Sequence, residues 1–176
     1  MHISQQGRRD RNVVAAWALA VADSVRVSAE QSTGMPGGAP AALVAIVADP
    51  GMSVDELRRV LGLTHPGAVR LVDRLVERGW VQREHGTGRT LRLTPTTAGG
   101  QAERRLLAAR EAAVDALHAH LDAAHVGALA GLLGPVLAEA TGGIDDLRRL
   151  CRLCDRDGCD PCPVWDTLDT GTLPGS

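Results

Sequence analysis

Residues 53–94 read SVDELRRVLGLTHPGAVRLVDRLVERGWVQREHGTGRTLRLT, and this stretch decides the fold. Ser53 stands three positions before Glu56, which is the pattern of a capping box, where a hydroxyl and a carboxylate each satisfy a backbone N–H. The pattern predicts a helix that begins at Val54, and Gly62 predicts the sharp turn that ends it.

A second helix is predicted directly after this turn. Thr64 is its expected N-cap, Pro66 fits its first turn because no N–H is needed there, and Gly79 predicts its end. The side expected to face the core consists of Ala68, Val69, Val72, Leu75 and Val76. The opposite side carries His65, Gly67, Arg70, Asp73, Arg74 and Glu77. This opposite side remains available to a partner.

Two short strands are predicted next, over residues 80–84 and 90–94, and the glycines between them fit a hairpin loop. A helix-turn-helix followed by a hairpin is a winged helix, so the predicted fold is mainly α with a small β-hairpin wing. Such a unit places its second helix in the major groove of double-stranded DNA and its hairpin against the adjoining backbone or minor groove.

Three segments of this region resemble a known family. They are LGLTHPGAVRLVDRLVERGWVQRE, the wing GTGRT, and LRLTPTTAGG at the start of a long helix, and together they resemble the MarR family of bacterial transcription regulators. With the flanking helices, the resemblance covers roughly residues 11–140. The wing departs from the family pattern, because Thr87 stands where an Asp is usual, two residues before Arg89. A different orientation of Arg89 is therefore expected.

The positive charge of the chain is concentrated in the same region. The chain has a formal net charge of −2, and all 19 of its basic residues are arginine. Residues 53–94 hold eight arginines and five acids, an excess of three positive charges, so the remainder carries an excess of five negative charges. Such a local excess is typical of a surface that faces phosphate, and the alternative is a solvated helix with internal ion pairs. The absence of Phe and Tyr argues against a single-strand binder, which needs stacking side chains.

An apolar segment, VVAAWALAVA at residues 13–22, follows a basic N-terminal start. This combination has the pattern of a secretion signal. The favoured interpretation is an amphipathic helix over about residues 10–30, because a DNA-reading unit follows it and implies a cytoplasmic protein. No charge-free run reaches the ~20 residues that a bilayer requires, so no membrane span is expected.

Further helices are predicted over residues 39–48, 96–121 and 122–140, with Pro135 expected to kink the last one. Together with the N-terminal helix, they carry more apolar surface than one winged unit can cover. The resemblance implies that the terminal helices of two subunits interleave into a homodimer, which presents two recognition helices to a palindromic site. It also implies that a small-molecule effector binds in the crevice between the helical and winged regions.

Four regions follow from these expectations. They are an N-terminal dimerisation helix and loop (1–38), a winged helix-turn-helix (39–95), C-terminal dimerisation helices (96–150) and a Cys-rich tail (151–176).

All four cysteines lie in the tail, with the spacing C-x2-C-x4-C-x2-C; they are Cys151, Cys154, Cys159 and Cys162. Two C-x2-C pairs suit a tetrahedral zinc–thiolate site, although the spacer between the pairs is shorter than in common zinc ribbons. The spacing is also compatible with an iron–sulfur cluster, with disulfide switching, or with four unliganded thiols. Zinc is the first expectation, because the acids of the intervening loop favour a bound cation.

The predicted function is sequence-specific transcription regulation, most simply repression by a homodimer whose DNA affinity falls when a ligand binds. The predicted DNA contacts are Thr64, His65, Gly67, Arg70, Arg74, Arg89 and Thr90. The alternatives are a metal or redox sensor with the tail as its input, and an interaction module that no longer binds DNA. No enzyme is predicted, because the sequence contains none of the phosphate-loop, G-x-S-x-G or H-E-x-x-H motifs.

Overall fold

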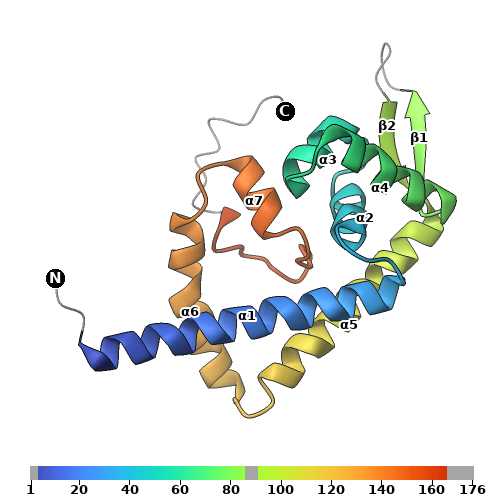
Figure 1. Ribbon diagram of the computed structural model, residues 1–176. Helices are drawn as coiled ribbons and strands as arrows, with labels where there is room; N and C mark the ends of the chain where they lie inside the picture. Colours follow the sequence, from blue (N-terminus) through green and yellow to red (C-terminus); the bar gives the residue numbers. More distant parts are fainter. Residues whose placement is uncertain (1–3, 86–90, 166–176) are drawn as a thin grey trace.

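The computed structural model describes residues 4–85 and 91–165. The elements are α1 (Gln5–Thr33), α2 (Ala39–Ala48), α3 (Val54–Leu61), α4 (His65–Glu77), β1 (Val81–His85), β2 (Leu91–Pro95), α5 (Thr97–Leu117), α6 (Ala123–Glu139) and α7 (Ile144–Leu150). The winged unit, α2 to β2, lies at one end of the molecule, and the long helices α1 and α5 cross beneath it (Figure 1). The predicted fold class, mainly α with a hairpin wing, is confirmed.

Helix α2 forms the buried base of the winged unit. Eight of its ten residues are buried, from Ala39 to Ile46. The main core forms where this helix meets α3, α4 and the hairpin, and its fully buried large side chains include Leu43, Ile46, Leu57 and Leu75. The core is aliphatic, as the absence of Phe and Tyr requires.

The apolar side of α4 is close to the predicted one, with one residue missed. Ala68, Val72 and Leu75 are buried as expected, whereas Val69 and Val76 are only partly buried. The missed core residue is Leu71, which is 4% exposed. The helical spacing from Ala68 through Leu71 to Leu75 could have identified it, since these residues share one face.

Strands β1 and β2 pair antiparallel, with Val81 opposite Pro95 and His85 opposite Leu91. Each strand begins and ends one residue later than predicted. Met52 forms an isolated bridge to Leu93, so the segment before α3 adds to the base of the hairpin. The predicted hairpin loop and its arginine lie outside the described residues.

Helix α1 is longer than predicted and α5 is shorter, and α1 and α6 leave apolar side chains exposed. Helix α1 begins before residue 10, and α5 ends at Leu117 rather than at residue 121. Exposed side chains include Leu19 on α1, at 68%, and Leu132 on α6, at 73%. In α6, which contains Pro135, the buried residue is Gly134.

Helix α1 also changes one expectation about membranes. By length and composition alone it could cross a membrane, and it is scarcely buried in the fold. The prediction missed it because only charge-free runs were considered, and α1 contains Asp23 and Arg26, which pair with each other at 3.6 Å. A helix that forms part of an interface between subunits can have the same length and composition, so α1 fits an interface helix as well as a membrane span.

One element was not predicted, the seven-residue helix α7, which directly precedes the Cys-rich tail. It packs against α3, and its buried residue is Leu147. Arg148 and Arg156 both reach Asp49 at the end of α2, at 3.5 Å and 3.4 Å. The tail is therefore docked on the winged unit rather than extending away from it.

The capping box at the start of α3 is present as predicted. The Ser53 hydroxyl accepts the Glu56 N–H at 3.2 Å, and the Glu56 carboxylate accepts the Ser53 N–H at 2.7 Å. These bonds to Ser53 hold the pKa of Glu56 below its usual range.

We expect Ser53→Ala to lower the free energy of unfolding by about 1 kcal/mol at neutral pH, because an N–H at the start of the helix loses its acceptor. The difference from wild type should shrink as the pH falls through the lowered pKa of Glu56, where protonation weakens the same box. Urea unfolding across this pH range measures both effects. Equal stability of the two proteins at neutral pH would contradict the role of the cap.

Candidate nucleic-acid interface

The start of α4 is built by the residues that the sequence singled out. Thr64 is the N-cap, and its hydroxyl accepts the Gly67 N–H at 3.3 Å. His65 and Pro66 follow in the first turn and are exposed. The hydroxyl hydrogen of Thr64 remains able to donate, so this turn can present both a hydroxyl and an imidazole to a ligand.

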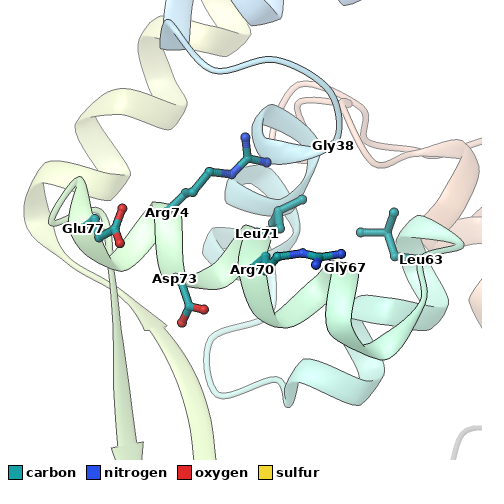
Figure 2. A pocket seen from close by; sticks show the side chains of 8 residues that line it. All are labelled: Gly38, Leu63, Gly67, Arg70, Leu71, Asp73, Arg74 and Glu77. Atoms are coloured by element: carbon teal, nitrogen blue, oxygen red, sulfur yellow. The ribbon is translucent and has the colours of Figure 1, made fainter.

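Two arginines extend from the exposed side of α4. Arg70 and Arg74 line a shallow groove of about 570 Å³ together with Gly38, Leu63, Gly67, Leu71, Asp73 and Glu77. Figure 2 shows Arg74 extending toward the loop at Gly38, while Asp73 points toward the hairpin. Both arginines are exposed, and neither forms an ion pair with another described residue.

The acid closest to these arginines along the helix is engaged elsewhere. Asp73 accepts a hydrogen bond from Arg83 on β1 at 2.6 Å, which ties the helix to the hairpin. Its negative charge is thereby balanced, and the charges of Arg70 and Arg74 are left available. The sequence alternative, in which the arginines of this helix pair with Asp73 and Glu77, is not what the structure shows among the described residues.

Several other arginines of the winged unit are held by internal partners. Arg58 and Arg59 both pair with Asp55, at 2.9 Å and 2.7 Å, and the hydrogen bond from Arg58 holds the pKa of Asp55 below its usual range. Arg92 donates to the Gly51 carbonyl at 2.9 Å. The local excess of positive charge is thus presented chiefly by α4.

Arg78 has a structural role that the sequence did not predict. Its guanidinium donates to the Gly34 carbonyl at 3.4 Å and lies 5.5 Å from the ring centre of Trp80. It therefore joins the end of α4 to the end of α1. No sequence signal could have found this contact, because it joins residues 44 positions apart.

The structure thus brings five of the seven predicted DNA contacts onto one element and its cap: Thr64, His65, Gly67, Arg70 and Arg74. The other two, Arg89 and Thr90, lie outside the described residues. Their contacts with DNA stay predictions.

The four predicted metal ligands lie along a different cavity, of about 530 Å³. Across residues 4–85 and 91–165, no three His, Cys, Asp or Glu side chains are placed so that they could hold a metal ion. Near the junction of α5 and α6, His118 accepts a hydrogen bond from Trp17, and the ring of His125 is hydrogen-bonded to Asp122, the N-cap of α6.

Comparison with known proteins agrees with this geometry. Residues 33–89, which include α2, α3, α4 and β1, match the sequence model of the MarR family. This segment of the chain is therefore similar to the MarR family. The match ends before β2, so it covers most of the winged unit and does not reach the Cys-rich tail. No curated protein matches the chain.

Solved MarR structures share the fold. The multiple antibiotic-resistance repressor of Listeria monocytogenes is 22% identical with a TM-score of 0.57, over 77% of this chain and 96% of that one. MepR, a transcription regulator of the Staphylococcus aureus efflux pump MepA, is 14% identical with a TM-score of 0.63, over 73% and 96%. A Mycobacterium tuberculosis MarR family protein in complex with DNA is 20% identical with a TM-score of 0.60, over 71% and 94%.

Proposed function

We propose that this protein is a MarR-type, sequence-specific regulator that binds double-stranded DNA through α4. The observation that carries the proposal is the pair Arg70 and Arg74, exposed and without an ion-pair partner among the described residues, on the helix that begins at the Thr64 cap. Arginine is suited to this role because its planar guanidinium can bind guanine or phosphate through two hydrogen bonds.

The proposed contacts follow from the position of each side chain along α4. His65, Gly67 and Arg70 lie in the first half of the helix, which is the part that approaches base edges in helix-turn-helix proteins. Thr64 at the cap and Arg74 one turn beyond Arg70 are suited to phosphates on either side of the groove. The M. tuberculosis protein, which has the same fold, is known in complex with DNA.

The proposal includes a homodimer, supported by the apolar surface of the terminal helices. Val13, Val14 and Leu19 on α1 are each at least 59% exposed, and Leu132 and Val136 on α6 are at least 62% exposed. Monomeric soluble proteins rarely expose so many large apolar side chains along their terminal helices. A symmetric partner would cover them and would set the distance between two copies of α4.

We expect Leu132→Glu to convert a dimer into a monomer, because two buried carboxylates would face each other across the two-fold axis without partners. Light scattering on the purified full chain measures the mass directly. Leu91→Glu is the matched control, since Leu91 is also exposed but lies on the hairpin. An unchanged dimer in Leu132→Glu, or a monomeric wild type, would contradict the proposed interface.

We further propose that the protein is a repressor whose DNA affinity falls when a small molecule binds between the helical and winged regions. The M. tuberculosis protein is known in complexes with salicylic acid and with p-aminosalicylic acid. In this chain α1 and α5 meet α2 close to the start of the winged unit. A ligand that changes this packing would change the spacing of the two α4 helices, and so the affinity for DNA.

The function is tested by measuring the binding of the full chain to a random-sequence duplex and to the matching single strand at several salt concentrations. We expect binding to the duplex to weaken steeply with salt: the logarithm of the affinity should fall by about 0.9 for each phosphate contact per tenfold rise in salt concentration. Salicylate, added as a probe, should weaken binding to a selected operator. Equal affinity for both forms, or binding that does not respond to salt, would overturn the proposal.

A further inference from the structure

The last described part of the chain, residues 144–165, contacts both the winged unit and the long helices. This part, the docking segment, consists of α7 and the cysteine-containing residues that follow it. It lies after residues 33–89, which match the MarR family, and it contains none of the proposed DNA contacts. Neither the family match nor DNA binding therefore assigns it a role.

On one side, the docking segment holds the winged unit. Helix α7 packs against α3, and Leu147 of α7 is 6% exposed. Arg148 and Arg156 both pair with Asp49 at the end of α2, at 3.5 Å and 3.4 Å. A buried apolar side chain and two ion pairs thus attach the segment to α2 and α3, the helices on which α4 packs.

On the other side, the docking segment reaches the long helices. Where α1, α2 and α5 meet, one buried residue from each forms a small core of its own: Ala29, Val44 and Leu106. Leu153 of the segment packs against this small core. Farther along, Pro163 lies so close to α6 that a Cβ added to Gly134 would be 3.2 Å from the Pro163 Cβ. The segment therefore lies between α6 and the winged unit and joins the two (Figure 1).

Leu153 lies in the crevice between the helical and winged regions. Helices α1 and α5 belong to the helical region, α2 belongs to the winged unit, and the small core is where the three meet. Packing at this place fixes how the winged unit is oriented on the long helices. A small molecule that enters the crevice must displace Leu153, because two groups cannot fill the same space in a close-packed interior.

We propose that the docking segment is an intramolecular clamp that fixes the orientation of the winged unit on the terminal helices and thereby strengthens DNA binding. The inference rests on the proposed function, because its effect is on the affinity for DNA. Arg70 and Arg74 on α4 stay exposed while the segment is docked, so the clamp orders the DNA-binding surface and does not block it. Releasing the clamp should weaken binding, because a loose winged unit must lose orientational freedom when it binds.

The docking itself is tested without DNA, by hydrogen exchange of the full chain followed by mass spectrometry. Leu147→Asp places a carboxylate at a buried position, so the backbone N–H groups of residues 148–165 should exchange at least about 10-fold faster than in wild type. Those of α4 should keep the wild-type rate, which shows that the winged unit is still folded. Leu150→Asp is the matched control on the same helix, because Leu150 is 36% exposed, and it should leave exchange unchanged.

Further variants act at the other contacts of the segment. Leu153→Asp should release the segment from the small core and give a similar rise in exchange. Asp49→Arg should raise exchange a few-fold, because it turns two attractions into repulsions, and adding Arg148→Asp and Arg156→Asp should restore the wild-type rate. This restoration distinguishes release of the segment from a general loss of stability.

DNA binding is then measured on the same proteins by fluorescence titration of the selected operator. Leu147→Asp and Leu153→Asp should weaken binding by about 3- to 10-fold, because only molecules with a docked segment hold α4 in the binding orientation. Leu150→Asp should bind like wild type. Light scattering should give the same mass for all of these proteins, so that a change in assembly does not account for the loss.

Two results would overturn the clamp. The first is wild-type exchange of residues 148–165 in both Leu147→Asp and Leu153→Asp, because the segment would then not be held by these contacts. The second is a released segment with operator binding as tight as in wild type, which would leave the proposed function intact and remove the clamp from it. Failure of the wild type to bind any duplex would refute the proposed function together with the effect of the clamp on DNA, and it would do so whatever the exchange experiment shows.

Discussion

Gly99→Ala is expected to lose about 3 kcal/mol of unfolding free energy, because a methyl group at this position has no room. The added Cβ would overlap the carbonyl oxygen of Trp80 and would lie 2.9 Å from its carbonyl carbon. Both are backbone atoms, so no side chain can move aside to relieve the clash.

The start of α5 cannot shift away from Trp80, because hydrogen bonds tie it to the segment that joins α4 to β1. The Thr96 N–H donates to the Trp80 carbonyl at 2.9 Å, and the Thr96 hydroxyl donates to the Gly79 carbonyl at 2.6 Å. The Gly99 N–H in turn donates to the Thr96 hydroxyl at 3.0 Å. A methyl group at Gly99 would therefore have to break the cap that joins α5 to the winged unit.

Gly100→Ala is the matched control, because the nearest atom to its added Cβ is the flexible Arg104 guanidinium at 3.8 Å. Alanine there should be neutral or stabilise α5 by up to about 1 kcal/mol, since glycine disfavours helix. Thermal unfolding should separate the two variants by roughly 10 °C. Equal melting temperatures would contradict the close packing of Gly99 in α5 against the backbone of Trp80.

The second large effect is expected in DNA binding by Arg70→Ala and Arg74→Ala. Arg70→Ala should weaken binding to a selected operator by about 10- to 100-fold and relax the preference for one base pair in each half-site, because it removes a base contact. Arg74→Ala should weaken binding to all sequences by a similar factor and reduce the salt slope by about 1, because it removes a phosphate contact.

Fluorescence titration of a labelled operator measures these affinities, and Arg149→Ala is the charge-matched control. Arg149 is exposed on α7 and pairs with Asp146 at 2.8 Å, away from α4. The variant should bind like wild type. Losses of the same size in Arg149→Ala and Arg70→Ala would mean that net charge, and not the exposed side of α4, controls binding.

The parts of the fold that depend on local signals could be predicted from the sequence. The bounds of α2 and the start of α3 agree with the prediction, because proline, glycine and the capping box act within a few residues. Helix α7 was missed because seven residues are too short for a periodic pattern. Its position depends on docking against α3, including the 3.9 Å contact of Arg59 with Asp145, which no local signal contains.

The same limit applies to the interface. The cap and the exposed side of α4 follow from helical spacing, so the positions of His65, Arg70 and Arg74 were predictable. Which arginines are available was not predictable, because it depends on contacts made after folding. The pair of Arg83 with Asp73 requires the hairpin to fold back on α4, and the contact of Arg156 with Asp49 joins residues 107 positions apart.

The tail shows why spacing alone did not identify a chemistry. Two C-x2-C pairs are compatible with zinc, iron–sulfur and disulfide chemistry, and zinc was the first expectation. Which residues surround the thiols is a tertiary feature, because the cavity that all four cysteines line also includes Leu147 and Arg148 of α7.

The central claim is that α4 reads DNA sequence through Arg70, and selection of bound fragments from a random duplex pool tests it most directly. Wild type and Arg70→Ala are carried through the same selection in parallel. The wild-type protein should enrich an inverted repeat with half-sites about one helical turn apart, and the variant should lose the preference at one position in each half-site. Enrichment of the same sequence by both proteins, or of no sequence by the wild type, would contradict the claim.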